Sequence, residues 1–592
     1  MDAADHRLIA NSPFTVGVSG HRDLDPVEMP QLREAVTQFV RQLKEHLPDT
    51  DLRLIVGMAE GADLLVARTA LELGVDVEAV LPMPLASYAA DFEPETLTSL
   101  KELLRHPQVR CVELADGAPR CDQLVQHNPA ERDAMYAHLT NTLIRRSSLL
   151  LALWDGKVSR LPGGTADTVL RYLGMRSDAN PGAARVEFME GSEDPDGERL
   201  VYWTPTARSG SGSAAANLPP CYLSGGGDTV LQVRRAMPAL LRQQLHELNA
   251  YNLEFRRLVQ ADQILPRNGL MSDLPGSIAP AELRLLADMD AQYAKADALA
   301  VYYQRRSDRL FHLFGLMACA MGLAYLTYER LTESPVLLIA YLVTLLTSLA
   351  VYYVLQGKRW FGKHLTYRAL AETLRARFYL RLAGADQRVD AVEVLELSGI
   401  DRFHGFGWIT FVIKGIEPPD LRGEPFRELD PLQVRHAEQA WIDSQYAYFT
   451  RKVARLERAS RRVKHLRQAL FIAILLVISV LFAFGEPLRH IRMGFGVPLR
   501  NVLTFSMGAL AVLLGVWELH QDKMATRELL WQYRNQLSHF SRARTLLGRL
   551  STPARRNDVL AELGKDSLME SYLWAIHRYH REHEPPAAGG GS

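Results

Sequence analysis

Residues 335–355 read PVLLIAYLVTLLTSLAVYYVL and contain no charged side chain. A helix of this length is long enough to cross the roughly 30 Å hydrocarbon core of a bilayer. Three shorter uncharged apolar runs complete the pattern, and the four runs form two close pairs. We therefore expect two membrane hairpins, with spans at about 311–327, 335–355, 469–484 and 502–517.

The charges that flank these runs predict their orientation. Gln304–Arg309 precedes the first hairpin and Gly357–Lys363 follows it, and each segment carries three Lys or Arg residues. The positive-inside rule then places both ends of this hairpin in the cytoplasm. The second hairpin follows the basic segment Arg461–Arg467, although its outer loop also carries Arg489, Arg492 and Arg500. The alternative is that the four runs are buried helices of a soluble domain; their paired arrangement between basic helices favours the membrane.

Bulk composition excludes several other classes. A chain of 592 residues is too long for one hydrophobic core. Its 68 Lys and Arg residues balance 68 Asp and Glu residues, so net charge predicts no nucleic-acid partner. The four cysteines form no C-x-x-C pair, and the sequence predicts neither disulfides nor a metal site. Met1–Ser12 lacks a signal-peptide core, so we expect a multi-pass protein of the bacterial inner (cytoplasmic) membrane with both termini cytoplasmic.

The N-terminal part alternates short strands with amphipathic helices. The expected strands are Phe14–Val18, Leu52–Val56, Val77–Leu81, Leu149–Leu153 and Val201–Trp203. Helical apolar spacing marks 29–47 and 63–73 between the first three strands. Strands that alternate with helices predict a doubly wound, Rossmann-like α/β fold with a parallel sheet.

Three glycine loops follow predicted strands and precede predicted helices. They are Gly17–Asp23, Gly57–Asp63 and Pro162–Thr165, the last just after Asp155-Gly156. In a parallel sheet such loops meet at the carboxyl edge, where α/β proteins bind ligands. Glycine lets the backbone approach a phosphate, and helix amino termini supply partial positive charge. The predicted ligand-binding residues are Ser19, Gly20, His21, Arg22, Gly57, Glu60, Gly61, Ala62, Asp63, Tyr88, Asp155, Gly156, Gly163, Gly164 and Thr165.

Several of these residues have two interpretations. Arg22 is expected to contact a phosphate, and Glu60 and Asp155 to accept hydrogen bonds from a ribose or base. Asp63 either lines the site or caps its own helix. Tyr88 either stacks on a base or packs over the sheet edge. The glycines themselves are also explained by tight turns between strand and helix.

The loops Gly17–Arg22, Gly57–Asp63, Leu81-Pro82 and Pro162–Thr165 resemble the SLOG superfamily over about 14–208. The membrane half resembles SLATT two-helix modules at Tyr367–Arg375, Trp441–Phe449 and Leu563–Arg578. The resemblance implies a nucleotide-sensing domain coupled to a membrane element, in antiviral defence or a stress response. It also implies an ADP-ribose-like or cyclic nucleotide ligand, with no metal.

These patterns divide the chain into five parts. A SLOG-like domain covers 1–232, with a flexible loop at about 204–227. A helical region with the first SLATT-like hairpin covers 233–396, and a connector covers 397–433. The second hairpin and C-terminal helices cover 434–586, and 587–592 is a linker scar. The order basic helix, apolar run, turn, apolar run, long helix occurs twice, which indicates an internal repeat.

The expected function is a membrane effector that binds a nucleotide and opens a pore as a homo-oligomer. The alternative is a membrane-anchored nucleotide N-glycosidic hydrolase. Hydrolase relatives implied by the resemblance carry Gly, Thr and Glu where this chain has Ala166, Asp167 and Leu170. Asp167 is the nearest carboxylate, and we expect it to be a solvated helix residue. His21, His138, His312 and His465 are isolated in the sequence. The sequence therefore favours a sensor over an enzyme.

Overall fold

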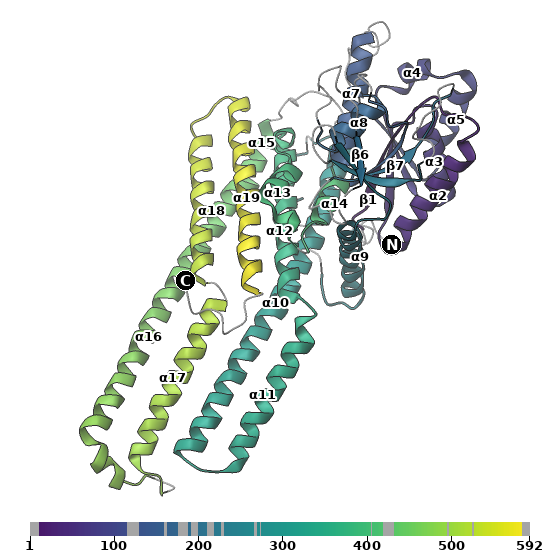
Figure 1. Ribbon diagram of the computed structural model, residues 1–592. Helices are drawn as coiled ribbons and strands as arrows, with labels where there is room; N and C mark the ends of the chain where they lie inside the picture. Colours follow the sequence, from purple (N-terminus) through teal and green to yellow (C-terminus); the bar gives the residue numbers. More distant parts are fainter. Residues whose placement is uncertain are drawn as a thin grey trace. The chain divides into compact units, whose positions relative to one another are not determined.

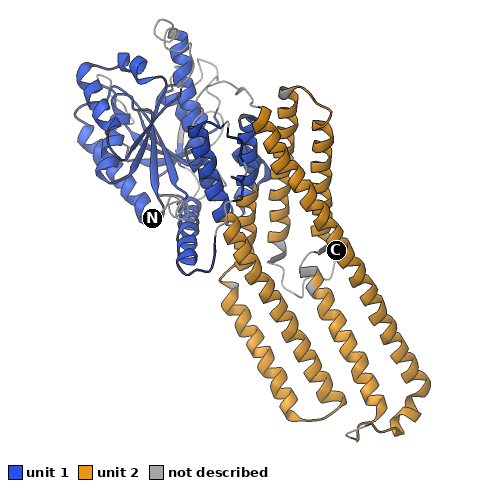
Figure 2. Ribbon diagram, turned by 180° about the vertical axis from the view of Figure 1, so that it is seen from behind, with its two compact units in different colours: residues 1–295, 373–429 blue, residues 296–372, 430–592 orange. Residues whose placement is uncertain are grey.

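The computed structural model divides the chain into two compact units. Unit 1 comprises residues 1–295 and 373–429, and unit 2 comprises 296–372 and 430–592 (Figure 2). The structure describes residues 11–114, 129–158, 163–175, 187–190, 199–209, 218–225, 230–265, 269–272, 274–276, 278–403, 405–417, 431–493, 496–523 and 526–582.

Unit 1 contains a nine-stranded sheet in the order β4-β3-β2-β1-β5-β7-β8-β9-β6 (Figure 1). Its strands are β1 (Phe14–Gly20), β2 (Leu52–Val56), β3 (Asp76–Leu81), β4 (Val109–Glu113), β5 (Leu149–Trp154), β6 (Glu187–Glu190), β7 (Val201–Pro205), β8 (Cys221–Gly225) and β9 (Val230–Arg234). The strands from β4 to β7 are parallel, whereas β8 runs antiparallel to both β7 and β9. The expected α/β class is confirmed, with an antiparallel extension that the sequence did not predict.

Helices link the parallel strands and pack against the sheet. The helices of unit 1 are α2 (Met29–His46), α3 (Ala62–Glu72), α4 (Leu85–Tyr88), α5 (Pro94–Leu104), α7 (Pro129–Arg146), α8 (Thr165–Tyr172), α9 (Ala239–Gln260), α13 (Ala391–Ser398) and α14 (Ile409–Gly415). Their apolar faces are buried: Val36 and Phe39 of α2 are at most 1% exposed. α14 lies within the segment 397–433 that the sequence analysis treats as a connector, and it packs on β1 through Phe411 and Phe14, with ring centroids 5.1 Å apart.

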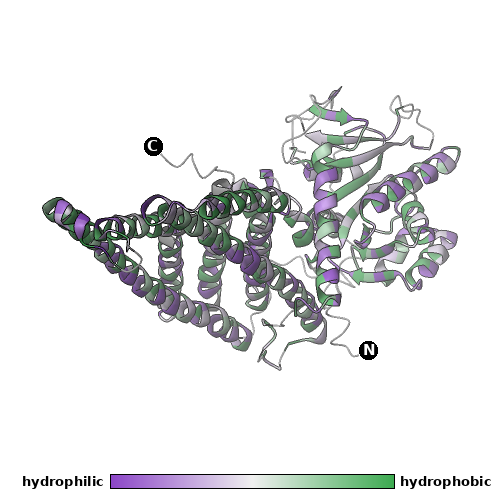
Figure 3. Ribbon diagram, turned by 90° about the horizontal axis from the view of Figure 1, so that it is seen from below, coloured by the Kyte–Doolittle hydropathy of each residue, from purple (hydrophilic) through white to green (hydrophobic). Residues whose placement is uncertain are grey.

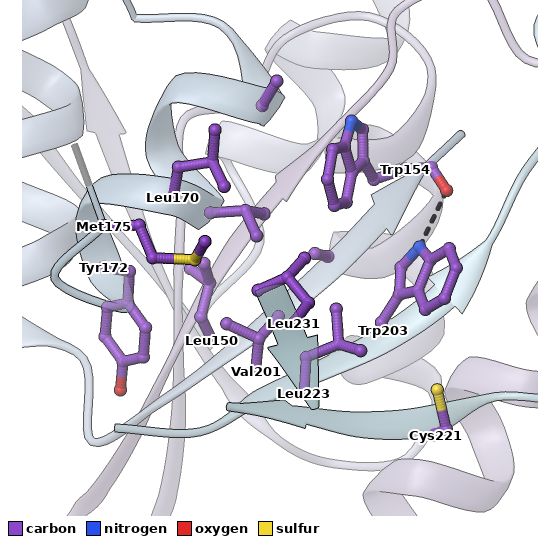
Figure 4. Packing of buried hydrophobic residues seen from close by; sticks show 13 residues of the cluster. Leu150, Trp154, Leu170, Tyr172, Met175, Val201, Trp203, Cys221, Leu223 and Leu231 are labelled. Atoms are coloured by element: carbon purple, nitrogen blue, oxygen red, sulfur yellow. Dashed lines mark hydrogen bonds between the residues drawn. The ribbon is translucent and has the colours of Figure 1, made fainter. Parts of the chain in front are cut away.

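The core between α8 and the sheet is formed by large apolar side chains (Figure 4). Trp154 and Trp203, on adjacent strands, are both fully buried. The indole of Trp203 donates a hydrogen bond to the carbonyl oxygen of Trp154 at 2.9 Å. Each ring thus contributes apolar area, and the buried donor of Trp203 is satisfied.

A buried ion pair lies beside the central strands. Arg146, at the end of α7, donates to both carboxylate oxygens of Glu78 in β3, at 2.7 and 3.0 Å. Both residues are more than nine-tenths buried. Although burial opposes ionisation, the adjacent guanidinium lowers the pKa of Glu78. The sequence does not predict this pair, because a carboxylate inside a strand and an arginine 68 residues away give no local signal.

Unit 2 is helical and contains four helices that are long and apolar enough to cross a membrane. They are α10 (Pro280–Arg330), which begins in unit 1, α11 (Pro335–Gln356), α16 (Ser444–His490) and α17 (Leu499–Lys523). The most apolar segment of each of these helices is not buried within the protein. Figure 3 shows hydrophobic residues along the helices of this unit. α16 has a non-helical residue at Phe484 and a proline at 487, so the helix kinks where the expected span ends.

The two halves of unit 2 repeat the same order of helices. The first half has helices of 51, 22 and 23 residues, α10, α11 and α12 (Trp360–Leu382). The second half has helices of 47, 25 and 22 residues, α16, α17 and α18 (Thr526–Leu547). A Tyr-Arg pair lies in each third helix, and its arginine pairs with the first helix of its own half: Arg368 with Asp297 at 2.9 Å, and Arg534 with Glu457 at 2.6 Å. These matching helices and contacts support the internal repeat.

The C-terminal helix α19 (Pro553–Glu582) joins the two halves. Asn535 of α18 donates to Glu570 of α19 at 2.8 Å. Arg359, directly before α12, donates to the Tyr579 hydroxyl at 3.1 Å. α19 therefore contacts both repeats. The predicted linker scar at 587–592 lies outside the described residues, as do 210–217 and 226–227 of the predicted flexible loop and 404 and 418–430 of the connector.

The hairpins also meet through glycines. A methyl group on Gly322 of α10 would lie 2.6 Å from Val512 of α17. A methyl group on Gly508 of α17 would lie 2.8 Å from Leu326 of α10. Small residues let membrane helices approach closely, and close approach increases van der Waals contact. These two glycines therefore hold the two hairpins together.

We expect Gly322→Ala to destabilise the protein by about 1–3 kcal/mol, because the added methyl overpacks the contact. The measurement is thermal unfolding of the full chain in detergent micelles. Gly315→Ala is the matched control, because its methyl would lie 3.8 Å from Val516, an ordinary contact distance. Equal stability of the two variants would show that the α10–α17 contact is not tight.

Candidate functional site

The candidate site lies at the carboxyl edge of the sheet, where the strand order reverses. From β1 the chain proceeds through β2 and β3 to β4 on one side, and then returns to β5 on the other side of β1. Such a switch point separates the loops of two neighbouring strands and leaves a crevice for a ligand. Ser19 and Gly20 end β1, His21 and Arg22 follow it, and Asp155 and Gly156 follow β5.

His21 and Asp155 connect these two loops. Nε2 of His21 lies 3.1 Å from Oδ1 of Asp155, and both side chains are about 4% exposed. Arg208 approaches both groups, with Nη2 3.1 Å from Nδ1 of His21 and Nε 3.5 Å from Oδ2 of Asp155. The backbone amide of Asp155 also donates a hydrogen bond to Nε2 of His21 at 3.0 Å. Burial, followed by the charge of Arg208, lowers the pKa of His21 against the opposing effect of Asp155.

The description of His21 as isolated is therefore wrong. Its partners come 134 and 187 residues later in the chain, and their proximity depends on the pairing of β1 with β5 and β5 with β7. Asp155 was predicted as a site residue from its place after β5. Arg208 was missed, although it follows β7 at the same edge of the sheet, which is the signal that indicates it.

The second glycine loop contacts the first one directly. Gly61 has a φ of 80°, and a methyl group on it would lie 2.3 Å from the carbonyl oxygen of Arg22. The amide of Ala62 donates to the carbonyl oxygen of His21 at 3.0 Å. Glycine is therefore required at position 61 by backbone packing as well as by its left-handed conformation.

Asp63 holds the second loop in place. Helix α3 is capped at Gly61, and no side chain bonds to its cap. Asp63 instead accepts from the amide of Ala59 at 3.1 Å, and it is 7% exposed. The capping interpretation is thus wrong, because the carboxylate turns back into the loop. Burial raises the pKa of Asp63 to about 7, although the Ala59 amide and the Arg22 charge oppose this shift.

The third loop packs on α7. A methyl group on Gly163, which has a φ of 77°, would lie 2.8 Å from the backbone of Tyr136. Gly164 caps α8, and Thr165 begins it. Asp167 accepts from the amide of Gly163 at 3.0 Å and is only 7% exposed. The expectation that Asp167 is solvated is therefore wrong, since its carboxylate fixes the loop.

Arg22 and Tyr136 bring all three loops to one point. The guanidinium of the exposed Arg22 lies 5.1 Å from the centre of the Tyr136 ring, a cation–π contact. The Tyr136 hydroxyl donates to Asp91, which also pairs with Arg132 at 2.5 Å. Asp91, Arg132 and Tyr136 were not predicted as site residues, because nothing in a helix or a short turn distinguishes them before the fold is known.

Two predicted ligand contacts are used by the protein itself. Tyr88 is fully buried and donates to the carbonyl oxygen of Gly57 at 3.1 Å. Its ring contacts Phe92 edge-on, so it packs over the sheet edge and has no free face for a base. Glu60 is half-buried and accepts from the Thr96 hydroxyl at 3.0 Å. The groups still open to a ligand are Arg22, Arg208 and backbone amides at the loop ends.

The site combines exposed cations with helix amino termini. The first-turn amides of α3 and α8 lack intrahelical acceptors, and they add partial positive charge at this edge. Within the described ranges, no group of three or more His, Cys, Asp or Glu residues is arranged to hold a metal ion. Such an arrangement can bind phosphate groups without a metal.

No protein-family model matches the chain, and the search of curated proteins finds no significant match.

Asp63→Asn should change how stability depends on pH. The native state keeps the Asp63 proton up to about pH 7, whereas the unfolded chain loses it near pH 4. Stability from this group is therefore fully present below pH 4 and is lost as pH rises through 7, by about 2–4 kcal/mol. Asparagine keeps the acceptor for Ala59 and does not titrate, so the variant should lose less stability between pH 5 and 8.

The measurement is the unfolding temperature of the full chain across this pH range. Asp23→Asn is the control, because Asp23 is exposed and the variant should follow the wild-type profile. An Asp63→Asn profile parallel to that of the wild type would contradict the buried, protonated carboxyl group.

Proposed function

We propose that unit 1 binds a nucleotide or an ADP-ribose-like ligand at the carboxyl edge of the sheet. The observation that carries this proposal is the meeting of three glycine loops around Arg22 at the switch point between β1 and β5. Arg22 and Arg208 are the cations for a phosphate, and the buried pair of His21 and Asp155 holds Arg208 at this edge. The resemblance of these loops to the SLOG superfamily points the same way.

The chain is proposed to act through the membrane. One apolar helix is enough to anchor a protein in a bilayer, whereas this chain has four candidate spans in two hairpins. The resemblance to SLATT modules also supports an effector role in the bacterial inner membrane. Two hairpins cannot enclose a pore, so a channel requires a homo-oligomer. The expected setting is antiviral defence or a stress response.

The proposed mechanism is a ligand-biased equilibrium between closed and open assemblies. A ligand shifts such an equilibrium only by its difference in affinity for the two states. A change from about 1:99 to 99:1 requires roughly 5.5 kcal/mol, which several phosphate contacts across an oligomer supply. Helix α10, which begins in unit 1 and includes the first span, is the proposed route of transmission.

Hydrolysis is less well supported by the geometry. Asp167 is buried, accepts from Gly163 and lies 3.5 Å from Arg171, so its carboxylate is engaged within its own loop. A general base or an ion-stabilising carboxylate must instead face the ribose.

Replacing Arg22 tests the binding site. We expect Arg22→Ala to weaken binding of the nucleotide by about tenfold or more, because a charge-assisted phosphate contact contributes roughly 1.5–3 kcal/mol. The measurement is calorimetry of the full chain in detergent against ATP, cyclic nucleotides and ADP-ribose. Arg41→Ala, an exposed arginine on α2, is the matched control and should bind normally. Equal affinity of the two variants would show that Arg22 does not contact the ligand. If the wild type bound none of these compounds, the proposed site would be refuted.

Ion flux tests the membrane output. Liposomes that contain the full chain should release trapped ions when the bound nucleotide is added. The flux should be lost in Arg22→Ala and kept in Arg41→Ala. Nucleotide binding without flux would refute the pore and leave the binding site standing. Steady product formation that stops in Asp167→Asn would instead establish the hydrolase.

A further inference from the structure

Unit 1 contains a small cavity at the opposite edge of the sheet from the glycine loops. Ser148 and Leu200, which directly precede β5 and β7, form one side of it. The other sides come from the start of α9, from α13 and from α14. Its volume is about 60 Å³, enough for a few water molecules or a ligand of a few heavy atoms, and too small for a nucleotide.

Lys414 lines this cavity from a closely packed part of the chain. It lies on α14 and is 6% exposed. The next residue, Gly415, packs so closely that a methyl group on it would lie 2.8 Å from the carbonyl oxygen of Pro13. The Lys414 ammonium lies 5.6 Å from the centre of the Tyr172 ring, and it forms no hydrogen bond or ion pair with any residue that the structure describes.

No carboxylate forms an ion pair with the Lys414 ammonium among the residues that the structure describes. Arg199 lines the same cavity and pairs with Glu396 at 3.4 Å, while Asp390 and Asp401 are the other nearby carboxyl groups. Burial, together with the charge of Arg199, lowers the pKa of Lys414 to about 8, although Glu396 opposes this shift. At pH 7.5 roughly a quarter of such amines are neutral, against about 0.1% for an ordinary lysine. A neutral buried amine is a nucleophile.

We propose that Lys414 is a carbamylation site, at which its amine reacts reversibly with carbon dioxide in this cavity. The nitrogen lone pair forms a bond to the carbon of carbon dioxide. One carbon–oxygen π bond breaks, and its electron pair moves to oxygen. The nitrogen then loses a proton to water, which leaves a carbamate with one negative charge. No oxidant, reductant or further reactant takes part.

The surroundings favour this product over the free amine. A carbamate places negative charge beside Arg199, whose contact with Glu396 is long for an ion pair. It also removes an unpaired cation from a largely buried position, where such a charge is costly. Carbon dioxide has three heavy atoms and fits the volume of the cavity.

Lys295 provides an internal comparison. It is 2% exposed, but its ammonium donates to Asn252 at 2.5 Å and lies 3.5 Å from the Ser12 hydroxyl. It does not line the cavity. Burial alone is therefore shared by the two lysines, whereas an adjoining cavity and an unpaired amine belong to Lys414. We expect no carbamate at Lys295.

The test uses the full chain in detergent micelles with isotopically labelled bicarbonate, observed by carbon NMR. A carbamate resonance should appear in the wild type and disappear in Lys414→Arg, which keeps a cation. It should persist in Lys295→Arg, or, if that variant does not fold, in Lys358→Arg, whose lysine is exposed. Arg199→Gln should lower its intensity by roughly fivefold, because the carbamate loses its partner.

Absence of a resonance that depends on Lys414 would overturn the proposal, as would a resonance that survives when the chain is unfolded in denaturant. Chemical trapping of the carbamate followed by mass spectrometry identifies the modified peptide. Failure of this test leaves the nucleotide site untouched, because the two sites lie at opposite edges of the sheet.

Discussion

The hydrocarbon core of a membrane accepts a polypeptide only if every backbone amide and carbonyl group is satisfied within the chain. This constraint explains why the apolar segments of unit 2 are helical, within helices up to 51 and 47 residues long. It also explains why the departure from helical geometry at Phe484 coincides with the end of an apolar run, where water can satisfy the freed groups. The charged residues that follow, Glu486 and Arg489, belong to the polar side of that boundary.

The sequence predicts those features that have a local period. Strand β5 is a continuous apolar run, and the four candidate membrane spans are long apolar helices, so both kinds of element were expected correctly. The sequence does not predict burial of polar groups. Glu78, Asp63 and Asp167 have the composition of surface residues, yet each is enclosed by segments that pack on it only in the folded chain. The antiparallel strands β8 and β9 were not predicted, because they lie in and beside a Gly- and Ser-rich segment.

The candidate site follows the same division. Its position at the carboxyl edge was predictable, since loops after parallel strands must converge there. Which side chains face a ligand and which support the loops was not predictable. Tyr88, Asp63 and Asp167 support the loops, whereas Arg208 and Tyr136 complete the exposed surface. Because the loops are fixed by contacts within the protein, binding of the proposed ligand would require little reordering of the backbone.

The glycine contacts between α10 and α17 also bear on the homo-oligomer proposed above. In the view of Figure 1 these two helices lie between α16 and α11. The two helices that touch through glycines are thereby covered by each other, whereas α11 and α16 keep their outward sides free of this contact. In the homo-oligomer proposed above, α11 and α16 would therefore be the helices left to meet a second copy of the chain.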